Sequence, residues 1–243
     1  MTIKHAIPAH HSHMFLFGGE TFVSADTAAL WWPREEALIV ADLHLEKGSW
    51  FAARGQMLPP YDSNATIKHL SDLAEKWQAR AIYCLGDNFH DDAGPSRLSD
   101  TALMALANLS SRLQIHWIVG NHDENMSAPI GEDVHQELLI HGLYLRHIAE
   151  DFETSPEISG HYHPKLRMQA QRRPISRPCF VMDERKLILP AFGSYAGGLD
   201  IYDEAISSQF SSQMIALVHT EERLCQFPVA VREVGFMASK TVA

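Results

Sequence analysis

Three apolar runs in the first half of the chain, 37–41, 81–85 and 115–119, predict buried strands. None of the three alternates regularly between apolar and polar residues, which is typical of strands covered on both faces in a parallel sheet. Between them, apolar residues recur at helical spacing over 67–77 and 98–109, which predicts two amphipathic helices. Strand, helix, strand, helix, strand in this order predicts right-handed crossovers and a largely parallel sheet.

After residue 133 the pattern changes to short apolar segments that are separated by turns, with no long helical period. These segments predict strands over 137–140, 143–147, 157–159, 166–170, 179–183 and 186–189, a late hairpin over 214–219 and 224–227, and two early strands over 14–17 and 21–24. We therefore expect an α/β first half and a mostly antiparallel second half. Two packed sheets with helices outside them, in a single domain over residues 1–243, fit both halves.

Composition narrows the class of protein. Of the 243 residues, 46% are hydrophobic and 21% are charged, which excludes an intrinsically disordered chain. No apolar run approaches the roughly 18 residues of a membrane span, and the N-terminus lacks the apolar segment of a signal peptide. Cys84, Cys179 and Cys225 are few and far apart, which predicts reduced thiols in a cytoplasmic protein. The net charge of −10 confines any nucleic-acid role to a local basic patch or to metal ions.

Metal-ligand residue types follow the buried strands, and two more follow a later short strand. Open α/β sheets place their sites at the carboxyl ends of the strands, so we expect these side chains to meet at one edge. They are Asp42 and His44 after 37–41, Asp87 after 81–85, Asn121, His122 and Asp123 after 115–119, and His161 and His163 after 157–159. The members of each His-containing pair, 42 with 44 and 161 with 163, would point to the same side of an extended segment.

The chemistry of these donors points to hard or borderline divalent cations. Carboxylate, amide and imidazole donors without a thiolate suit Mn²⁺, Fe or Zn²⁺. Asp87 is a candidate bridge between two ions. Two ions roughly 3.5–4 Å apart can activate a water and stabilise charge on a phosphoryl group.

The four motifs resemble those of the calcineurin-like metallophosphoesterases. Asp42-x-His44, Gly86-Asp87, Gly120-Asn121-His122-Asp123 and Gly160-His161-x-His163 occur in the order of that family. The resemblance implies a four-layer α/β/β/α sandwich and two divalent metal ions, with Mn²⁺ as the first choice and Fe or Zn²⁺ as alternatives. It implies that Asp42, His44, Asp87 and His163 hold one ion, and that Asp87, Asn121, His161 and a further His hold the second. It also implies that His122 lies at the scissile phosphate as proton donor or charge stabiliser, with Asp123 orienting it.

Two residues compete for the place of the further His. His141 is followed by Gly142, as in family members, whereas His147 ends the next predicted strand. We favour His147, because residues 140–143 have the pattern of a hairpin turn that would put His141 at the opposite edge. The second motif carries His90 where the common form of the family has an acidic residue, and we expect His90 to face the substrate.

Longer segments narrow the resemblance. Over almost the whole chain, the sequence resembles the bacterial ligase-associated DNA damage response endonucleases. The segments that carry this resemblance are DLHLEKGSWFAARG, LGDNFHD, SGHYHPKLR, RPCF and LPAFGSYAGGLD. That group implies DNA as the substrate and a repair ligase, a helicase and an exonuclease as partners. A phosphatase or nucleotide hydrolase of the same fold, or a non-catalytic scaffold, are the alternatives.

A basic stretch supports an anionic polymer independently of the resemblance. It contains no acidic residue and consists of Lys165, Arg167, Arg172, Arg173 and Arg177 among neutral residues. Such a cluster, directly after the last predicted ligand, would guide a phosphate backbone to the site, with Arg172 and Arg173 as contacts. The alternative interpretation is a solvated charged hairpin.

Overall fold

A computed structural model describes residues 11–56, 59, 62–131, 133–151, 154–170, 173–211 and 213–230. Its first sheet has seven strands, in the spatial order of the sequence. These are β1 (Met14–Phe17), β2 (Glu20–Asp26), β3 (Ala29–Trp32), β4 (Ala37–Val40), β5 (Ala81–Leu85), β6 (Gln114–Ile118) and β7 (Val134–His135). Strands β1 to β4 pair antiparallel, and β4 to β7 pair parallel, as the buried runs predict.

The second sheet also has seven strands. Their spatial order is β16 (Leu224–Ala230), β15 (Gln213–His219), β13 (Phe180–Met182), β14 (Lys186–Ile188), β10 (Glu157–Ser159), β9 (Leu143–Leu145) and β8 (Leu138–Ile140). Pairing is mostly antiparallel, but β10 runs parallel to both of its neighbours. A separate two-stranded hairpin joins β11 (Lys165–Ala170) to β12 (Arg173–Pro178).

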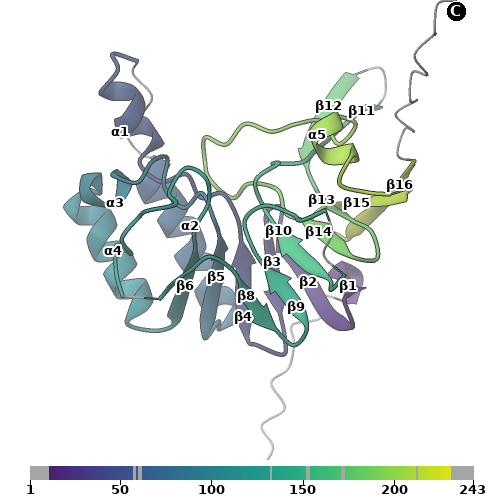
Figure 1. Cartoon of the computed structure of the whole chain (residues 1–243), viewed down its shortest axis with the longest axis horizontal. Coiled ribbons are helices and arrows are strands. Elements are labelled where there is room, and N and C mark those ends of the chain that lie inside the picture. Colours follow the sequence, from purple (N-terminus) through teal and green to yellow (C-terminus); the bar gives the residue numbers. More distant parts are fainter. Residues whose placement is uncertain are drawn as a thin grey trace, which may run out of the picture.

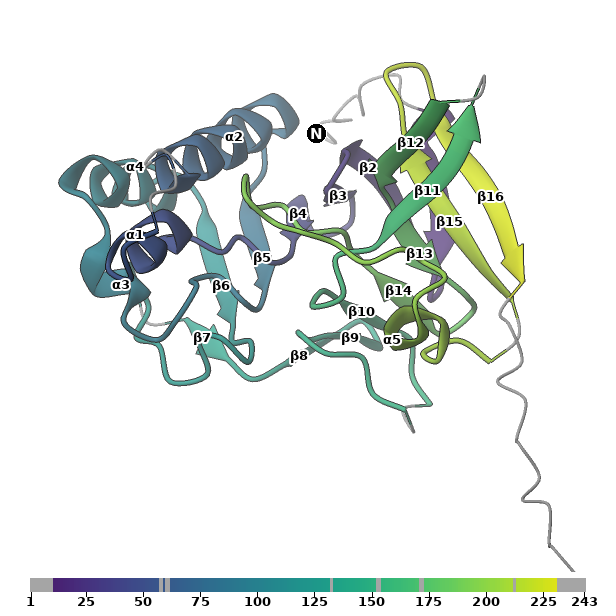
Figure 2. The same ribbon diagram turned by 90° about the horizontal axis from the view of Figure 1, so that it is seen from above.

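Three apolar cores separate four layers. Helices α2 (Asp62–Trp77) and α4 (Asp100–Ser110) cover the outer face of the first sheet (Figures 1 and 2). Along β4, Leu38 and Val40 pack in the core with these helices, whereas Ile39 packs in the core between the sheets. The opposite face of the second sheet is covered by the short helix α5 (Glu204–Ser207) and its flanking segments, through Ile201, Ile206 and Phe210. The α/β sandwich expected from the resemblance is confirmed, with a fourth layer that contains little helix.

Several short elements were not predicted. Strand β3 has no alternation that could mark it, and helices α1 (Lys47–Ala52) and α3 (Gly94–Arg97) are too short for a period to emerge. Strand β12 contains Pro174 and Pro178, which argue against a strand in a sheet interior but are tolerated in a two-stranded hairpin. Among the described residues, no helix is long and apolar enough to span a membrane.

The parallel strands bring several loops to one edge of the first sheet. The segment after β4 leads to α1, and the segment after β10 leads to the hairpin β11–β12. Figure 1 shows α1 and this hairpin projecting from the same side of the molecule, one at each end.

Candidate metal centre

The backbone at this edge is left-handed at five predicted ligands. The φ angles are 55° for Asp42, 45° for His44, 45° for Asp87, 72° for His161 and 47° for His163. Such values are uncommon outside glycine and cluster at functional sites. The assumption that each His-containing pair lies in an extended segment is therefore wrong. The pairs converge through tight turns instead.

The loops after β4 and β5 run side by side, which fixes these turns. The His44 N–H donates to the carbonyl of Asp87 at 2.9 Å, and the Leu45 N–H donates to the carbonyl of Asn88 at 2.8 Å. The parallel pairing of the two strands thus continues past their ends, and Asp42 and Asp87 stay adjacent.

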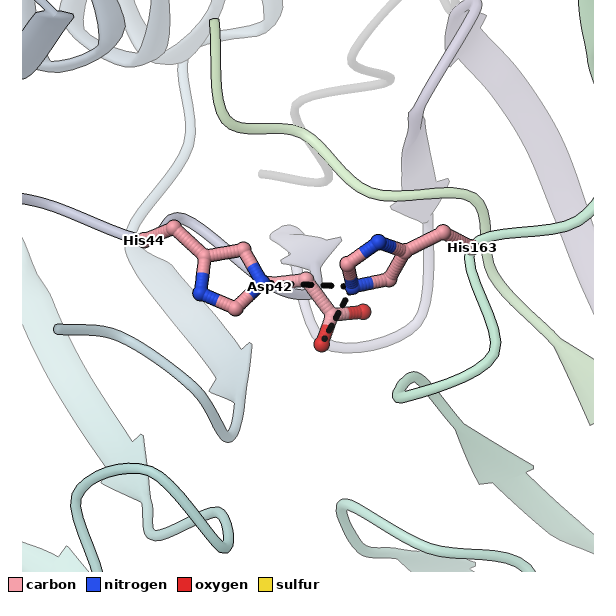
Figure 3. Close-up of side chains that lie close together, drawn as sticks. All are labelled: Asp42, His44 and His163. Atoms are coloured by element: carbon pink, nitrogen blue, oxygen red, sulfur yellow. Dashed lines mark hydrogen bonds and ion pairs between the residues drawn. The ribbon is translucent and has the colours of Figure 1, made fainter. Parts of the chain in front are cut away.

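The first ligand group consists of Asp42, His44 and His163, whose ligand atoms lie within 4.8 Å of one another (Figure 3). His163 Nε2 lies 3.3 Å from Asp42 Oδ1 and 3.3 Å from His44 Nε2. Asp42 is fully buried, and its Oδ2 accepts from the His161 N–H at 2.9 Å. Burial, aided by the nearby His163 and Lys47, lowers the pKa of His44 to about 2, so its imidazole is neutral at pH 7 and free to bind a cation.

The second ligand group consists of Asp87, His147 and His161, also within 4.8 Å, with Asn121 in contact with His147. His147 Nδ1 donates to the carbonyl of Leu85 at 3.0 Å, which leaves the lone pair of Nε2 facing the group. That nitrogen lies 3.1 Å from Asn121 Oδ1 and 3.3 Å from Asp87 Oδ1. Both oxygens are acceptors, so three electron-rich atoms converge on one point. A cation satisfies such a set, and these spacings match ligand atoms about 3.0–3.4 Å apart around an ion with bonds of roughly 2.0–2.2 Å.

Asp87 connects the two groups. Its Oδ1 lies 3.3 Å from His147 Nε2 in the second group, and its Oδ2 lies 4.0 Å from His44 Nε2 in the first. The Oδ1 atom also accepts from the His122 N–H at 3.0 Å, which holds the carboxylate plane. Each group therefore has one Asp87 oxygen turned toward it.

Gly120 allows the third motif to approach this closely. A Cβ placed there would lie 2.3 Å from both the backbone nitrogen and Oδ1 of Asp87. Any side chain at this position would therefore displace the shared carboxylate.

Asp123 occupies a different position from the one expected. Its buried carboxylate accepts from the backbone N–H groups of Asn88 and Phe89 at 2.7 and 3.0 Å, and from that of Gly120 at 2.7 Å. It thus ties the second motif to the third. The ring of His122 is held instead by the carbonyl of His90, 3.2 Å from His122 Nδ1. The expected role of Asp123 in orienting His122 stays a prediction, and through these bonds it would act by way of the loops.

His122 and His90 lie on the open side of the centre. His122 Nε2 lies 3.9 Å from Asp87 Oδ2, and its side chain is 42% exposed, so a substrate phosphate can reach it. The His90 ring stacks between His122 (centroids 5.2 Å apart) and Phe51 of α1 (5.8 Å). Burial lowers the pKa of His90 to about 4, so this ring is neutral at pH 7. Its predicted contact with substrate stays a prediction. The sequence analysis did not predict that Phe51 of α1 would stack on His90. Phe51 lies in the segment DLHLEKGSWFAARG, which carries the resemblance to the endonucleases.

The remaining predicted residues differ in whether the structure brings them to a ligand group. His141 lies in the turn between β8 and β9 and pairs with Glu35 at 2.7 Å, outside both ligand groups, whereas His147 is part of the second. Arg173 is exposed on the hairpin, and Arg172 lies outside the described residues. The roles of His147 and Arg173 stay predictions.

A third His and carboxylate group was not predicted from the sequence. It contains His116, Asp133 and His135. The two imidazoles each lie 2.5 Å from a different oxygen of Asp133. That separation is that of direct N–H···O contacts and is shorter than the spacing of two ligands on one ion. We therefore interpret this group as a hydrogen-bonded triad.

Comparisons with known proteins agree with this geometry. The family model described as calcineurin-like phosphoesterase matches residues 37–189, which contain all the predicted ligands. A crystal structure of Pseudomonas putida nuclease MPE is similar to the chain with a TM-score of 0.65 and 25% identity, covering 88% of this chain and 98% of that one. No curated protein sequence matches. The chain belongs to the calcineurin-like phosphoesterase family.

Proposed function

We propose that this phosphoesterase is a phosphodiesterase that cleaves DNA with two divalent metal ions, Mn²⁺ foremost and Fe or Zn²⁺ as alternatives. The observation that carries the proposal is the Asp87 carboxylate, which turns one oxygen toward each ligand group. The similarity to a solved nuclease supports a nucleic acid over a phosphoprotein or a free nucleotide. A role in repair beside a ligase, a helicase and an exonuclease belongs to the same proposal.

The donor sets support a proposed set of ligands for each ion. Asp42, His44 and His163 would hold one ion, and His147, His161 and Asn121 the other, with Asp87 shared. Two ions bound there would supply an activated water and charge stabilisation for the phosphoryl group. The protein supplies neutral imidazoles, because burial lowers the pKa of both His44 and His161.

His122 is placed to handle a proton on the substrate side. Its Nδ1 faces the carbonyl of His90, so that nitrogen carries a hydrogen, and the proton available to a leaving oxygen is the one on Nε2. Nε2 lies 3.9 Å from Asp87 Oδ2, on the side of the ring that faces the metal centre. Asp123 acts at one remove, by holding the loops that carry Asp87 and His122 in register.

The hairpin β11–β12 offers the local positive surface that an acidic protein needs to bind DNA. Arg167, Arg173 and Arg177 are exposed on it, and it begins at Lys165, two residues after the predicted ligand His163. A polyanion lying along this hairpin would be led to the metal centre.

Reversing the charge of Arg167 and Arg173 together, each to Glu, is expected to lower kcat/KM for a DNA oligonucleotide about tenfold relative to a small diester at low salt. The difference should shrink as salt rises, because screening weakens both the attraction and the repulsion. Initial rates at several salt concentrations measure this effect. The matched control reverses Arg80 and Arg112, which precede β5 and β6 at the opposite edge. Equal losses of kcat/KM in the two double variants would show that the hairpin does not bind DNA.

The proposed reaction is tested on three substrate classes, with protein stripped of metal and then supplied with Mn²⁺, Mg²⁺ or Zn²⁺. We expect Mn²⁺ to restore cleavage of a single-stranded oligonucleotide and of bis(p-nitrophenyl) phosphate. Little release is expected from the monoester p-nitrophenyl phosphate. Preference for the monoester would favour a phosphatase, and absence of turnover on all three would favour a scaffold.

A further inference from the structure

A half-enclosed cavity of about 260 Å³ adjoins the metal centre at His163. It lies between α2, the turn after β2 and the segment 190–197, with Lys165 at the start of β11 on another side. His163 thus belongs both to the first ligand group and to the lining of this cavity. The cavity is slightly smaller than the roughly 300–1,000 Å³ of most small-molecule sites, so it suits one unit of a polymer.

The wall made by segment 190–197 is fixed to the metal centre. The Phe192 N–H donates to the carbonyl of Ala41 at 2.9 Å, and the Gly193 N–H donates to the carbonyl of Asp42 at 3.1 Å. A Cβ at Gly193 would lie 2.3 Å from the carbonyl oxygen of Leu43, so only glycine permits this approach. The cavity is therefore preformed relative to Asp42.

The lining combines ring and proline side chains with a larger share of polar and charged groups. The rings of Phe192 and His69 stack with centroids 5.0 Å apart and planes 20° apart, and three prolines continue the apolar wall. Asp26 accepts a hydrogen bond from His69 at 2.6 Å, which neutralises that pair locally. Lys165 remains as the positive charge among the described lining residues. Its stem packs against Gly198, where a Cβ would lie 2.7 Å from Lys165 Cε.

From this arrangement, and on the basis of the proposed function, we propose that the cavity binds the nucleoside next to the scissile phosphate. The base or sugar lies against the prolines and the stacked His69 and Phe192 rings. Lys165 faces the next phosphate along the strand. Because Lys165 also begins the basic hairpin, the strand continues from the metal centre through the cavity onto β11.

Gly197 provides a direct test, because it lines the cavity and a Cβ there meets no atom within 4 Å. We compare thymidine 5′-(p-nitrophenyl phosphate), thymidine 3′-(p-nitrophenyl phosphate) and methyl p-nitrophenyl phosphate, which share one leaving group. For the wild type, kcat/KM for at least one thymidine ester should exceed that for the methyl ester about tenfold. Gly197→Phe fills the cavity and should reduce this ratio to about one. Gly197→Ala, the matched control, should keep most of it.

Lys165→Ala is a second test that does not depend on how the larger side chain is accommodated. It should raise KM about tenfold for thymidine 3′-phosphate 5′-(p-nitrophenyl phosphate), and less for the ester without the second phosphate, with Lys165→Arg restoring most of the loss. Thermal unfolding shows which variants are folded.

The outcomes distinguish a failure of the proposed nucleoside site from a failure of the proposed phosphodiesterase activity. A wild-type ratio near one, or a ratio that Gly197→Phe leaves intact, overturns the nucleoside site while the phosphodiesterase stands. No turnover of any of the three esters by wild type with Mn²⁺ instead contradicts the proposed function itself.

Discussion

Replacing Asp87 with Asn is expected to lower kcat/KM for a phosphodiester at least about 10³-fold, which corresponds to roughly 4 kcal/mol of transition-state stabilisation. Asn keeps one carbonyl oxygen, so the acceptor for the His122 N–H can survive. It loses the charge and the second oxygen, and with them the ability to face both ligand groups. The variant should therefore bind metal more weakly at both groups, with little change in fold.

The matched control for this substitution is Asp91→Asn. Asp91 lies four residues further along the chain and pairs with Arg97 at 2.6 Å on a partly exposed surface, where an ion pair contributes about 1 kcal/mol or less. Steady-state kinetics with added Mn²⁺ and elemental analysis of both variants measure the effect. If Asp87→Asn retains a tenth or more of wild-type activity, the shared carboxylate is not the centre of catalysis.

Gly86→Ala is expected to displace His147 and so to disrupt the second ligand group. Gly86 has a φ of 74°, and a Cβ there would lie 2.4 Å from both Cγ and Nδ1 of His147. His147 cannot yield without losing the hydrogen bond from Nδ1 to the carbonyl of Leu85. We expect at least about a hundredfold loss of activity, equal to roughly 3 kcal/mol at the transition state. We also expect a lower free energy of unfolding, from the collision and from left-handed strain of roughly 1–2 kcal/mol.

Gly142→Ala separates the collision from the strain. Gly142 has a similar φ of 81°, but a Cβ there meets no atom within 4 Å, and it lies in the turn between β8 and β9. Urea unfolding of the metal-free proteins should show a loss of about 1–2 kcal/mol in this control. Its activity should stay near that of the wild type. Similar losses of activity in both variants would mean that the position of His147 does not matter.

The sequence carried enough information to predict the sheet edge and the motifs gathered on it. Strands β4 and β5 are buried on both faces and β6 over most of its length, so they appear as apolar runs, and the polar residues at their ends stand out. The choice between His141 and His147 also followed from local chemistry, because His141 and Gly142 both take left-handed φ angles in a hairpin turn. The structure brings only His147 to the predicted ligands.

Features that depend on contacts between distant segments could not be predicted. The left-handed backbone at Asp42 and Asp87 comes from hydrogen bonds between the loops after β4 and β5. Asp123 bonds to the backbone of residues 35 and 34 positions earlier, and no local pattern announces such a contact. The cavity beside His163 likewise combines residues from Asp26 to Gly197. Short elements such as α1 also lack a period of their own, since tertiary contacts stabilise them.

The most direct test of the account is the number of Mn²⁺ ions that the metal-free chain binds, measured by titration together with low-temperature electron paramagnetic resonance. We predict two ions per chain with the spectrum of a magnetically coupled pair, because one carboxylate faces both ligand groups. Asp87→Asn should abolish the coupling. A single uncoupled ion in the saturated wild-type protein would contradict the account.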